Sequence, residues 1–246
     1  MTTEFASLHI PGDPLILYNI WDAGSALAVA KSNPAAIATG SWAMAKAQGY
    51  NDGEVMPFDQ FTKTVEHIIE AVALPVTVDF EAGYAADHQR LRSNIDALNA
   101  LGTIGVNFED RIIGETDLRS AKDQCERIEV LRKSSDTLFI NARCDLMFDG
   151  ADLETQKDRI DDLIERSKAY ADAGADGFFV PGIADPSIIQ TVCDRCPMPV
   201  NIMRMTNAPI AEFSALGVAR ISHGPRPYLK LMQSLTEAAM GLMPQA

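Results

Sequence analysis

The segment Val76-Thr77-Val78-Asp79-Phe80-Glu81-Ala82-Gly83-Tyr84 decides the fold. Apolar and β-favouring residues run directly into two carboxylates and a glycine, which is typical of a buried strand that ends at a loop. Side chains at i and i+2 of an extended strand point to the same side, so we expect Asp79 and Glu81 to project together. Two adjacent carboxylates are costly to bury unless a cation or a proton lies between them. The segment therefore predicts an acidic site at a strand end, with a solvated loop start as the alternative.

Two further segments follow the same pattern. Ile104–Arg111 is an apolar run that ends in Glu109 and Asp110, and Leu138–Asp145 is one that ends in Arg143. In parallel α/β folds the carboxyl ends of the strands are where ligands bind. Oxygen ligands without histidine or cysteine suit Mg²⁺ or Mn²⁺ rather than Zn²⁺. We therefore expect a divalent-cation site beside Arg143 at one end of a parallel sheet.

Eight apolar runs along the chain predict strands, each closed by a polar, glycine or charged residue. They are Ile16–Trp21, Ala36–Thr39, Val76–Phe80, Gly105–Phe108, Leu138–Asn141, Gly177–Val180, Val200–Met203 and Ala219–Ser222. Helical patterns separate them, and strands that alternate with helices predict parallel βαβ units. Eight such units in 246 residues favour one (β/α)8 TIM barrel as a single catalytic domain, residues 1–246. An open doubly wound sheet is the alternative, but its G-x-G-x-x-G fingerprint is missing after the first strand.

Local signals place some helix ends. Asp152 is expected to begin a helix and Gly174 to end one, and Gly102 is expected to end the helix before the fourth strand. The last segment, 226–242, is more apolar than one helix covering a barrel requires. It predicts burial of this segment against a second subunit.

Composition excludes several classes of partner. The net charge of −13 argues against nucleic acid and anionic membrane surfaces. The N-terminal residues lack the pattern of a secretory signal, and no apolar run approaches the ~20 residues of a membrane span. Four cysteines in a chain of this size indicate reduced thiols, so we expect a cytoplasmic protein.

Taken in order, several motifs resemble the isocitrate lyase / phosphoenolpyruvate mutase superfamily, in particular its shorter bacterial members. The matching segments span nearly the whole chain: 19–25 (NIWDAGS), 37–41 (IATGS), 49–54 (GYNDGE), 78–84 (VDFEAGY), 106–110 (VNFED), 140–143 (INAR), 174–182 (GADGFFVPG) and 217–222 (GVARIS).

The resemblance implies a set of metal ligands and a (β/α)8 barrel. Asp79 matches the direct Mg²⁺ ligand, and Asp52, Glu81 and Glu109 match acids that hold the ion through waters. The cofactor would be Mg²⁺, with Mn²⁺ as a possible substitute. The last helix would be exchanged between subunits in a homodimer or homotetramer.

The resemblance also implies the substrate contacts. Arg143 matches the residue that binds the substrate carboxylate, and Ser41 with the Trp42 backbone matches a turn that cradles a 2-oxo-carboxylate group. The shared intermediate is an enolate of a 2-oxo acid such as pyruvate, stabilised by the metal and by fixed positive groups. The chain would thus be a lyase with a small-molecule 2-oxo acid as its substrate.

The loop after the fourth strand decides which reaction is expected. Residues 111–119 (RIIGETDLR) lack the cysteine and histidine of the methylisocitrate lyase loop and the lysine and asparagine of the phosphonate enzymes. The remaining site suffices to cleave a 2-oxo or 2-hydroxy di- or tricarboxylic acid at a carbon–carbon bond, as in an oxaloacetate decarboxylase. Three alternatives stay open: phosphonopyruvate hydrolase or phosphoenolpyruvate mutase-type C–P chemistry, methylisocitrate lyase-like chemistry, and a non-catalytic metabolite-binding barrel.

Three more residues are candidates because of where they follow the strands. Tyr84 comes shortly after the metal motif and is expected to line the pocket. His223 follows the last strand and is a candidate catalytic residue. Arg204 follows the seventh strand and is a candidate second contact for a substrate carboxylate.

Overall fold

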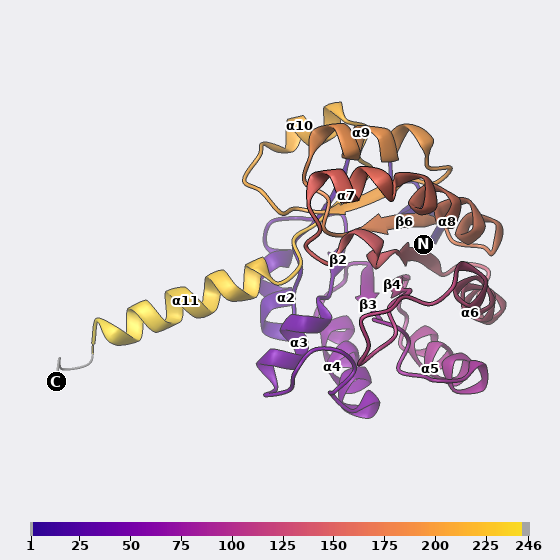
Figure 1. Cartoon of the computed structure of the whole chain (residues 1–246). Helices are drawn as coiled ribbons and strands as arrows, with labels where there is room; N and C mark the ends of the chain where they lie inside the picture. Colours follow the sequence, from indigo (N-terminus) through magenta and orange to yellow (C-terminus); the bar gives the residue numbers. More distant parts are fainter. Residues whose placement is uncertain (1, 243–246) are drawn as a thin grey trace.

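The apolar runs of the sequence form eight short strands in the computed structural model, which describes residues 2–242. The strands are β1 (Leu15–Leu17), β2 (Ile37–Ala38), β3 (Val76–Asp79), β4 (Gly105–Glu109), β5 (Phe139–Arg143), β6 (Gly177–Val180), β7 (Val200–Met203) and β8 (Arg220–Ser222). Helices and loops surround these strands (Figure 1).

All neighbouring strands pair in parallel, in the order β1-β8-β7-β6-β5-β4-β3-β2. A parallel bridge between Ile20 and Thr39 joins the chain after β1 to the chain after β2. The amide of Ile20 donates to Ala38 and the amide of Gly40 donates to Ile20, both at 2.9 Å. The sheet is thus a nearly closed barrel, which confirms the (β/α)8 prediction and excludes an open doubly wound sheet.

The helices are α1 (Thr2–Ala6), α2 (Ala23–Ala30), α3 (Ser41–Ala47), α4 (Phe58–Ala71), α5 (His88–Ala100), α6 (Ala121–Ser134), α7 (Leu153–Asp158), α8 (Ile160–Asp172), α9 (Pro186–Arg195), α10 (Ile210–Ala215) and α11 (Arg226–Met240). Five of the helices, α2, α5, α6, α7 and α9, begin at a side-chain cap. Asp152 caps α7 by accepting from the amide of Thr155, as its position predicted. Gly102 and Gly174 follow α5 and α8 with φ of 91° and 102°, a conformation that favours glycine at a helix end.

Two apolar clusters fill the molecule. The larger one lies between the barrel and its helices and includes Phe61, Phe108 and Phe178, each with 0% exposure. The smaller one lies inside the barrel at its N-terminal end, where Phe5 of α1 contacts Phe139 of β5 at a ring distance of 5.4 Å. Because α1 closes this end, the opposite rim is the one that can receive a ligand.

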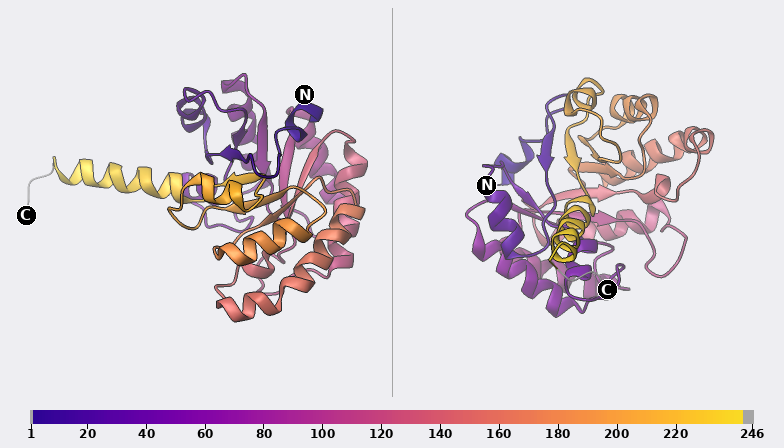
Figure 2. Two further views of the ribbon diagram at one scale, coloured as in Figure 1. Left: turned by 90° about the horizontal axis from the view of Figure 1, so that it is seen from above. Right: turned by 90° about the vertical axis from the view of Figure 1, so that its left-hand side faces the viewer.

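The last helix departs from the barrel. Figures 1 and 2 show that α11 extends away from the other elements along most of its length. Its apolar side chains are exposed, with relative accessibilities of 50% for Leu229, 51% for Leu231 and 61% for Leu235. Among residues 2–242, no helix combines the length and apolarity that crossing a membrane requires. The exchange of this helix between subunits stays a prediction.

Candidate active site

A cavity of about 120 Å³ opens at the carboxyl ends of the barrel strands. Its walls come from six strand ends and from the start of α3, and they are formed by Asn19, Gly40, Ser41, Trp42, Ala43, Asp52, Asp79, Asn107, Arg143, Phe148, Phe179, Pro181, Met203, Ser222, Gly224 and Pro225. Of the predicted site residues, Ser41, Trp42, Asp52, Asp79 and Arg143 line it.

Asp79, the last residue of β3, is held from two sides. Its Oδ2 accepts from the Ser41 amide at 3.0 Å and from the Ser41 hydroxyl at 2.8 Å. Its Oδ1 receives only a long contact of 3.4 Å from the Asn107 amide group. The Asp79 carboxylate is therefore fixed in orientation, while Oδ1 keeps an unused lone pair.

Glu81 lies behind Asp79 and is almost fully buried. It has a φ of 51°, because β3 ends at Asp79 and the chain turns there, so the extended geometry expected between the two acids is not present. Its carboxylate accepts from the Glu54 amide at 3.0 Å and from the Tyr84 hydroxyl at 2.8 Å. Burial, followed by the charge of Asp52, raises the pKa of Glu81 to about 8.

Arg143, the last residue of β5, pairs with two carboxylates of the site. Its Nη1 lies 2.8 Å from a Glu109 oxygen, and its Nε and Nη2 donate to the two oxygens of Asp145 at 2.5 and 2.9 Å. Burial opposes the charged form, but Glu109 and Asp145 outweigh it and raise the pKa of Arg143. Burial also raises the pKa of Glu109 well above its usual range, against the opposing charge of Arg143.

The four predicted metal ligands lie close enough to affect one another. Asp52 is exposed at the cavity, and its pKa is raised by desolvation and then by the charge of Asp79. Asp79 also raises the pKa values of Glu81 and Glu109. Clustered carboxyl groups resist ionisation because their negative charges repel one another. A hard divalent cation with oxygen ligands offsets this repulsion and favours the ionised form. The residues present therefore fit Mg²⁺ or Mn²⁺.

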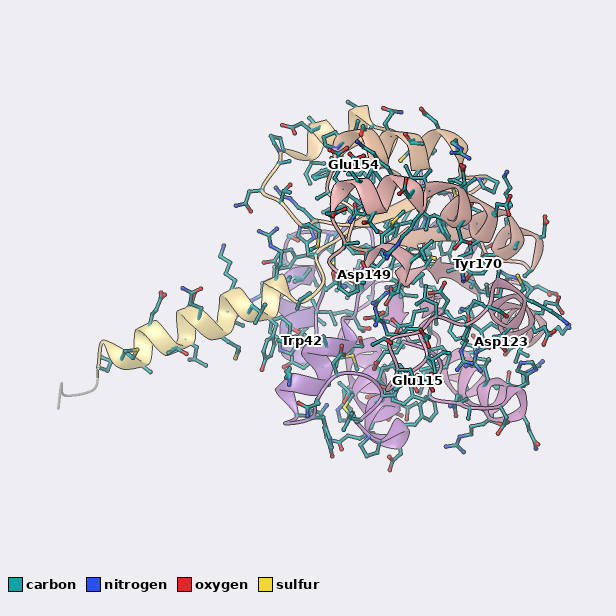
Figure 3. All side chains as sticks on the ribbon, viewed as in Figure 1. Trp42, Glu115, Asp123, Asp149, Glu154 and Tyr170 are labelled. Atoms are coloured by element: carbon teal, nitrogen blue, oxygen red, sulfur yellow. The ribbon has the colours of Figure 1, made fainter. Side chains whose placement is uncertain are left out.

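A second group with possible metal-ligand spacing lies on the outer surface. His88, Asp123 and Glu126 come from α5 and α6, and Asp123 pairs there with Arg119 at 2.9 Å. Figure 3 shows Asp123 among these outer helices. This surface group is separate from the acids of the barrel.

Five predicted site residues lie outside the cavity lining: the buried acids Glu81 and Glu109, and also Tyr84, Arg204 and His223. The ring of Tyr84 packs on Phe61 at 4.9 Å, so it contributes only its hydroxyl to Glu81. Arg204 and His223 directly follow the last residues of β7 and β8, Met203 and Ser222, which line the cavity. Arg204 donates to the Ala208 carbonyl at 2.8 Å, and the His223 ring lies 3.2 Å from the Leu17 carbonyl.

The sequence reasoning missed Asn107 and Asp145. Asn107 lies two residues before Glu109 in β4, and its Oδ1 accepts from Asn141 and from Arg220, both at 2.9 Å. Asp145 lies two residues after Arg143 and is fully buried. The same i, i+2 spacing that singled out Asp79 and Glu81 was available for both residues.

Comparison with known proteins agrees with this geometry. The sequence profile of the phosphoenolpyruvate phosphomutase family matches residues 5–243, so the chain belongs to that family. It is therefore an enzyme of the phosphoenolpyruvate mutase / isocitrate lyase type, a group of lyases and mutases, as the motifs predicted.

Two relatives and one solved structure illustrate the similarity. An uncharacterized protein of Mycobacterium tuberculosis is 31% identical over 240 residues, 96% of this chain and 87% of that protein. The crystal structure of a candidate phosphonomutase from Burkholderia cenocepacia is 41% identical with a TM-score of 0.93, and covers 97% of this chain and 98% of its own. An oxaloacetate decarboxylase of Rhodopseudomonas palustris is 25% identical over 182 residues, 74% of this chain and 62% of that enzyme.

Proposed function

We propose that the chain is a Mg²⁺-dependent lyase that cleaves a carbon–carbon bond of a small 2-oxo diacid, in the manner of an oxaloacetate decarboxylase. The observation that supports the proposal is the cavity lined by Asp79, Asp52 and Arg143, since it brings acids that could hold a cation together with a guanidinium that could bind a carboxylate. A relative named oxaloacetate decarboxylase supports the reaction class.

Each polar group of the cavity has a role in this reaction. Asp79 would hold the ion directly, with Asp52, Glu81 and Glu109 holding it through waters. A bound Mg²⁺ would supply Lewis acidity at the 2-oxo group. The three nitrogens of Arg143 each face one carboxylate oxygen, which leaves two of its five N–H groups for the substrate carboxylate.

The bond between C3 and the distal carboxylate of the substrate then breaks. The electron pair of that bond becomes the C2–C3 double bond while the carbonyl π pair moves to the 2-oxo oxygen, CO₂ leaves, and the resulting enolate takes a proton from solvent at C3 to give a 2-oxo monoacid. Phe148, Phe179 and Trp42 form apolar walls of the cavity that limit the access of water. Ser41 donates with both its amide and its hydroxyl to Asp79, so we assign it to orienting the metal ligand as well as to the turn beside the substrate.

Phosphonopyruvate-type C–P chemistry is the second candidate, because the matched Burkholderia structure is described as a candidate phosphonomutase. The arginines of the 111–119 loop are less suited to it. Arg111 pairs with Asp145 at 2.8 Å and Arg119 pairs with Asp123 at 2.9 Å, so both guanidinium groups already have carboxylate partners. Methylisocitrate lyase-like cleavage is less favoured still, because that loop has no cysteine or histidine.

We also propose that α11 packs on a second subunit, giving a homodimer or homotetramer in the cytoplasm. The exposed leucines of α11 support this assembly, since contiguous exposed apolar surface marks interaction sites. The proposal treats residues 1–246 as one catalytic domain.

A product assay separates the candidates. The protein with Mg²⁺ is incubated with oxaloacetate, phosphonopyruvate or methylisocitrate, and pyruvate, CO₂ and phosphate are measured against a protein-free Mg²⁺ blank. CO₂ and pyruvate from oxaloacetate above the blank are expected, and Asp79→Asn should fall to the blank while the exposed-site control Glu70→Gln stays active. Phosphate release from phosphonopyruvate alone would replace the proposal with the second candidate. No turnover of any substrate, together with no stabilisation by Mg²⁺ and oxalate, would favour the non-catalytic barrel.

A further inference from the structure

The carboxylate of Asp145 is shared between two arginines. Its Oδ1 and Oδ2 accept from Arg143 at 2.5 and 2.9 Å, and its Oδ2 also accepts from the Nε of Arg111 at 2.8 Å. The side chain of Asp145 has no exposed surface, and its amide donates to Asp110 at 2.9 Å. Asp145 is thus a fixed link between the cavity and Arg111.

Arg111 belongs to the loop that follows β4, not to the barrel wall. Arg111 forms an antiparallel β-bridge with Leu118, and the amide of Arg119 donates to the Asp110 carbonyl at 2.8 Å. The two ends of the 111–119 loop therefore lie side by side. The Arg111 side chain is 30% exposed, and its Nη2 lies 3.5 Å from the carbonyl of Phe148, whose side chain lines the cavity. The loop therefore reaches the active site through one charged contact from Arg111.

That contact changes the charge that a ligand in the cavity meets. Arg143 and Arg111 face Glu109 and Asp145, so the formal charges of this group balance. Without Arg111, two carboxylates would face one guanidinium, and the group would carry one net negative charge. Arg111 adds one positive charge to the group whether Glu109 is ionised or protonated. Because the group is buried, solvent ions screen that charge only weakly.

We infer that Arg111 is a positioning residue that offsets the charge of Asp145 and so lets Arg143 bind an anionic ligand. The inference rests on the proposed function, since it concerns the same carboxylate-binding group. It assigns to the loop an electrostatic role: anion affinity is high when Arg111 contacts Asp145 and lower when the contact is absent. The ligands it concerns are 2-oxo acids and their dianionic analogues.

The test compares ion and anion binding in the same proteins. Oxalate is titrated into Mn²⁺-saturated wild type, Arg111→Gln, Arg111→Lys and Arg119→Gln by calorimetry, and Mn²⁺ alone is titrated by electron paramagnetic resonance. Arg119 is the matched control, because it lies on the same loop but pairs with Asp123 of α6. Pyruvate is the second anion, since it carries one negative charge where oxalate carries two.

The inference predicts that Arg111→Gln weakens the binding of anions but not the binding of Mn²⁺. Arg111→Gln should weaken oxalate binding by roughly tenfold and pyruvate binding by less, while Mn²⁺ binding stays equal or becomes tighter. Arg111→Lys should recover most of the loss, and Arg119→Gln should match wild type. Equal oxalate affinity in wild type and Arg111→Gln would overturn the inference, as would weaker binding of Mn²⁺ and oxalate alike, which indicates a damaged loop. If wild type itself binds no oxalate with Mn²⁺, the proposed function fails and this inference with it.

Discussion

Replacement of Glu81 by glutamine should stabilise the metal-free protein above neutral pH. Glu81 is 5% exposed, and its pKa is raised from 4.5 to about 8, first by burial and then by the charge of Asp52. Between pH 4.5 and pH 8 the folded state therefore keeps a proton on Glu81 that the unfolded chain has released, so the free energy of unfolding falls as the pH rises through this range. Integrating the shift between pH 5 and pH 8 gives a loss of about 3 to 4 kcal/mol.

Glutamine reproduces the protonated acid. One of its groups accepts from the Glu54 amide, as Glu81 does at 3.0 Å, and the hydroxyl of Tyr84 can rotate to accept from its amide nitrogen. Wild type and Glu81→Gln should therefore be nearly equally stable at pH 5. At pH 8 the variant should be more stable by a few kcal/mol.

The assay is urea unfolding with a chelator present, at pH 5 and pH 8, for wild type, Glu81→Gln and the exposed control Glu70→Gln. Other acids of the cluster titrate in the same direction, so the difference between wild type and variant is the quantity to compare. Added Mg²⁺ should reduce the pH dependence of wild type, because the ion replaces the proton. A difference that is the same at both pH values would refute the reasoning.

Three further changes test the site and the assembly. Asp79→Asn should remove the rise in melting temperature that Mg²⁺ plus oxalate causes, and it should leave the melting temperature of the metal-free protein unchanged or higher. A rise that persists in the variant would contradict the role of Asp79 as a metal ligand. Ser41→Ala removes the hydroxyl contact to that carboxylate but keeps the amide contact, so Mn²⁺ affinity should fall by about tenfold, and unchanged affinity would refute the orienting role. Leu235→Glu places a charge on the exposed apolar face of α11, so sedimentation should show a smaller assembly than wild type, and an equal mass would argue against packing through this helix.

The fold could be predicted from the sequence because each strand is a short apolar run between helical patterns. All eight runs became strands, but the run expected at Ile16–Trp21 forms a ladder only over Leu15–Leu17. Beyond it, Ile20 makes a single bridge to Thr39. Hydropathy cannot show this difference, because a residue at the barrel seam is as buried as one in the ladder.

Part of the site could be predicted from strand ends, and part could not. Asp79 and Arg143 end strands and line the cavity, as alternation along a strand requires. Glu81 follows a strand with a positive φ, so its direction depends on the turn and on the Glu54 amide, neither of which the spacing reveals. The contact between Arg111 and Asp145 joins the loop after β4 to the start of a short 3-10 helix after β5, 34 positions along the chain, and only the folded chain brings them together.

The double hydrogen bond from Ser41 to one oxygen of Asp79 bears on which cation the protein would accept. With Oδ2 occupied, any ion that binds this carboxylate meets Oδ1 alone and cannot be held by both oxygens at once. Calcium commonly takes six to eight oxygens and uses carboxylates in the two-oxygen mode, whereas magnesium requires octahedral coordination and keeps several waters. Ser41 would thus disfavour calcium without contacting the ion, because its two hydrogen bonds leave Asp79 only one oxygen for coordination.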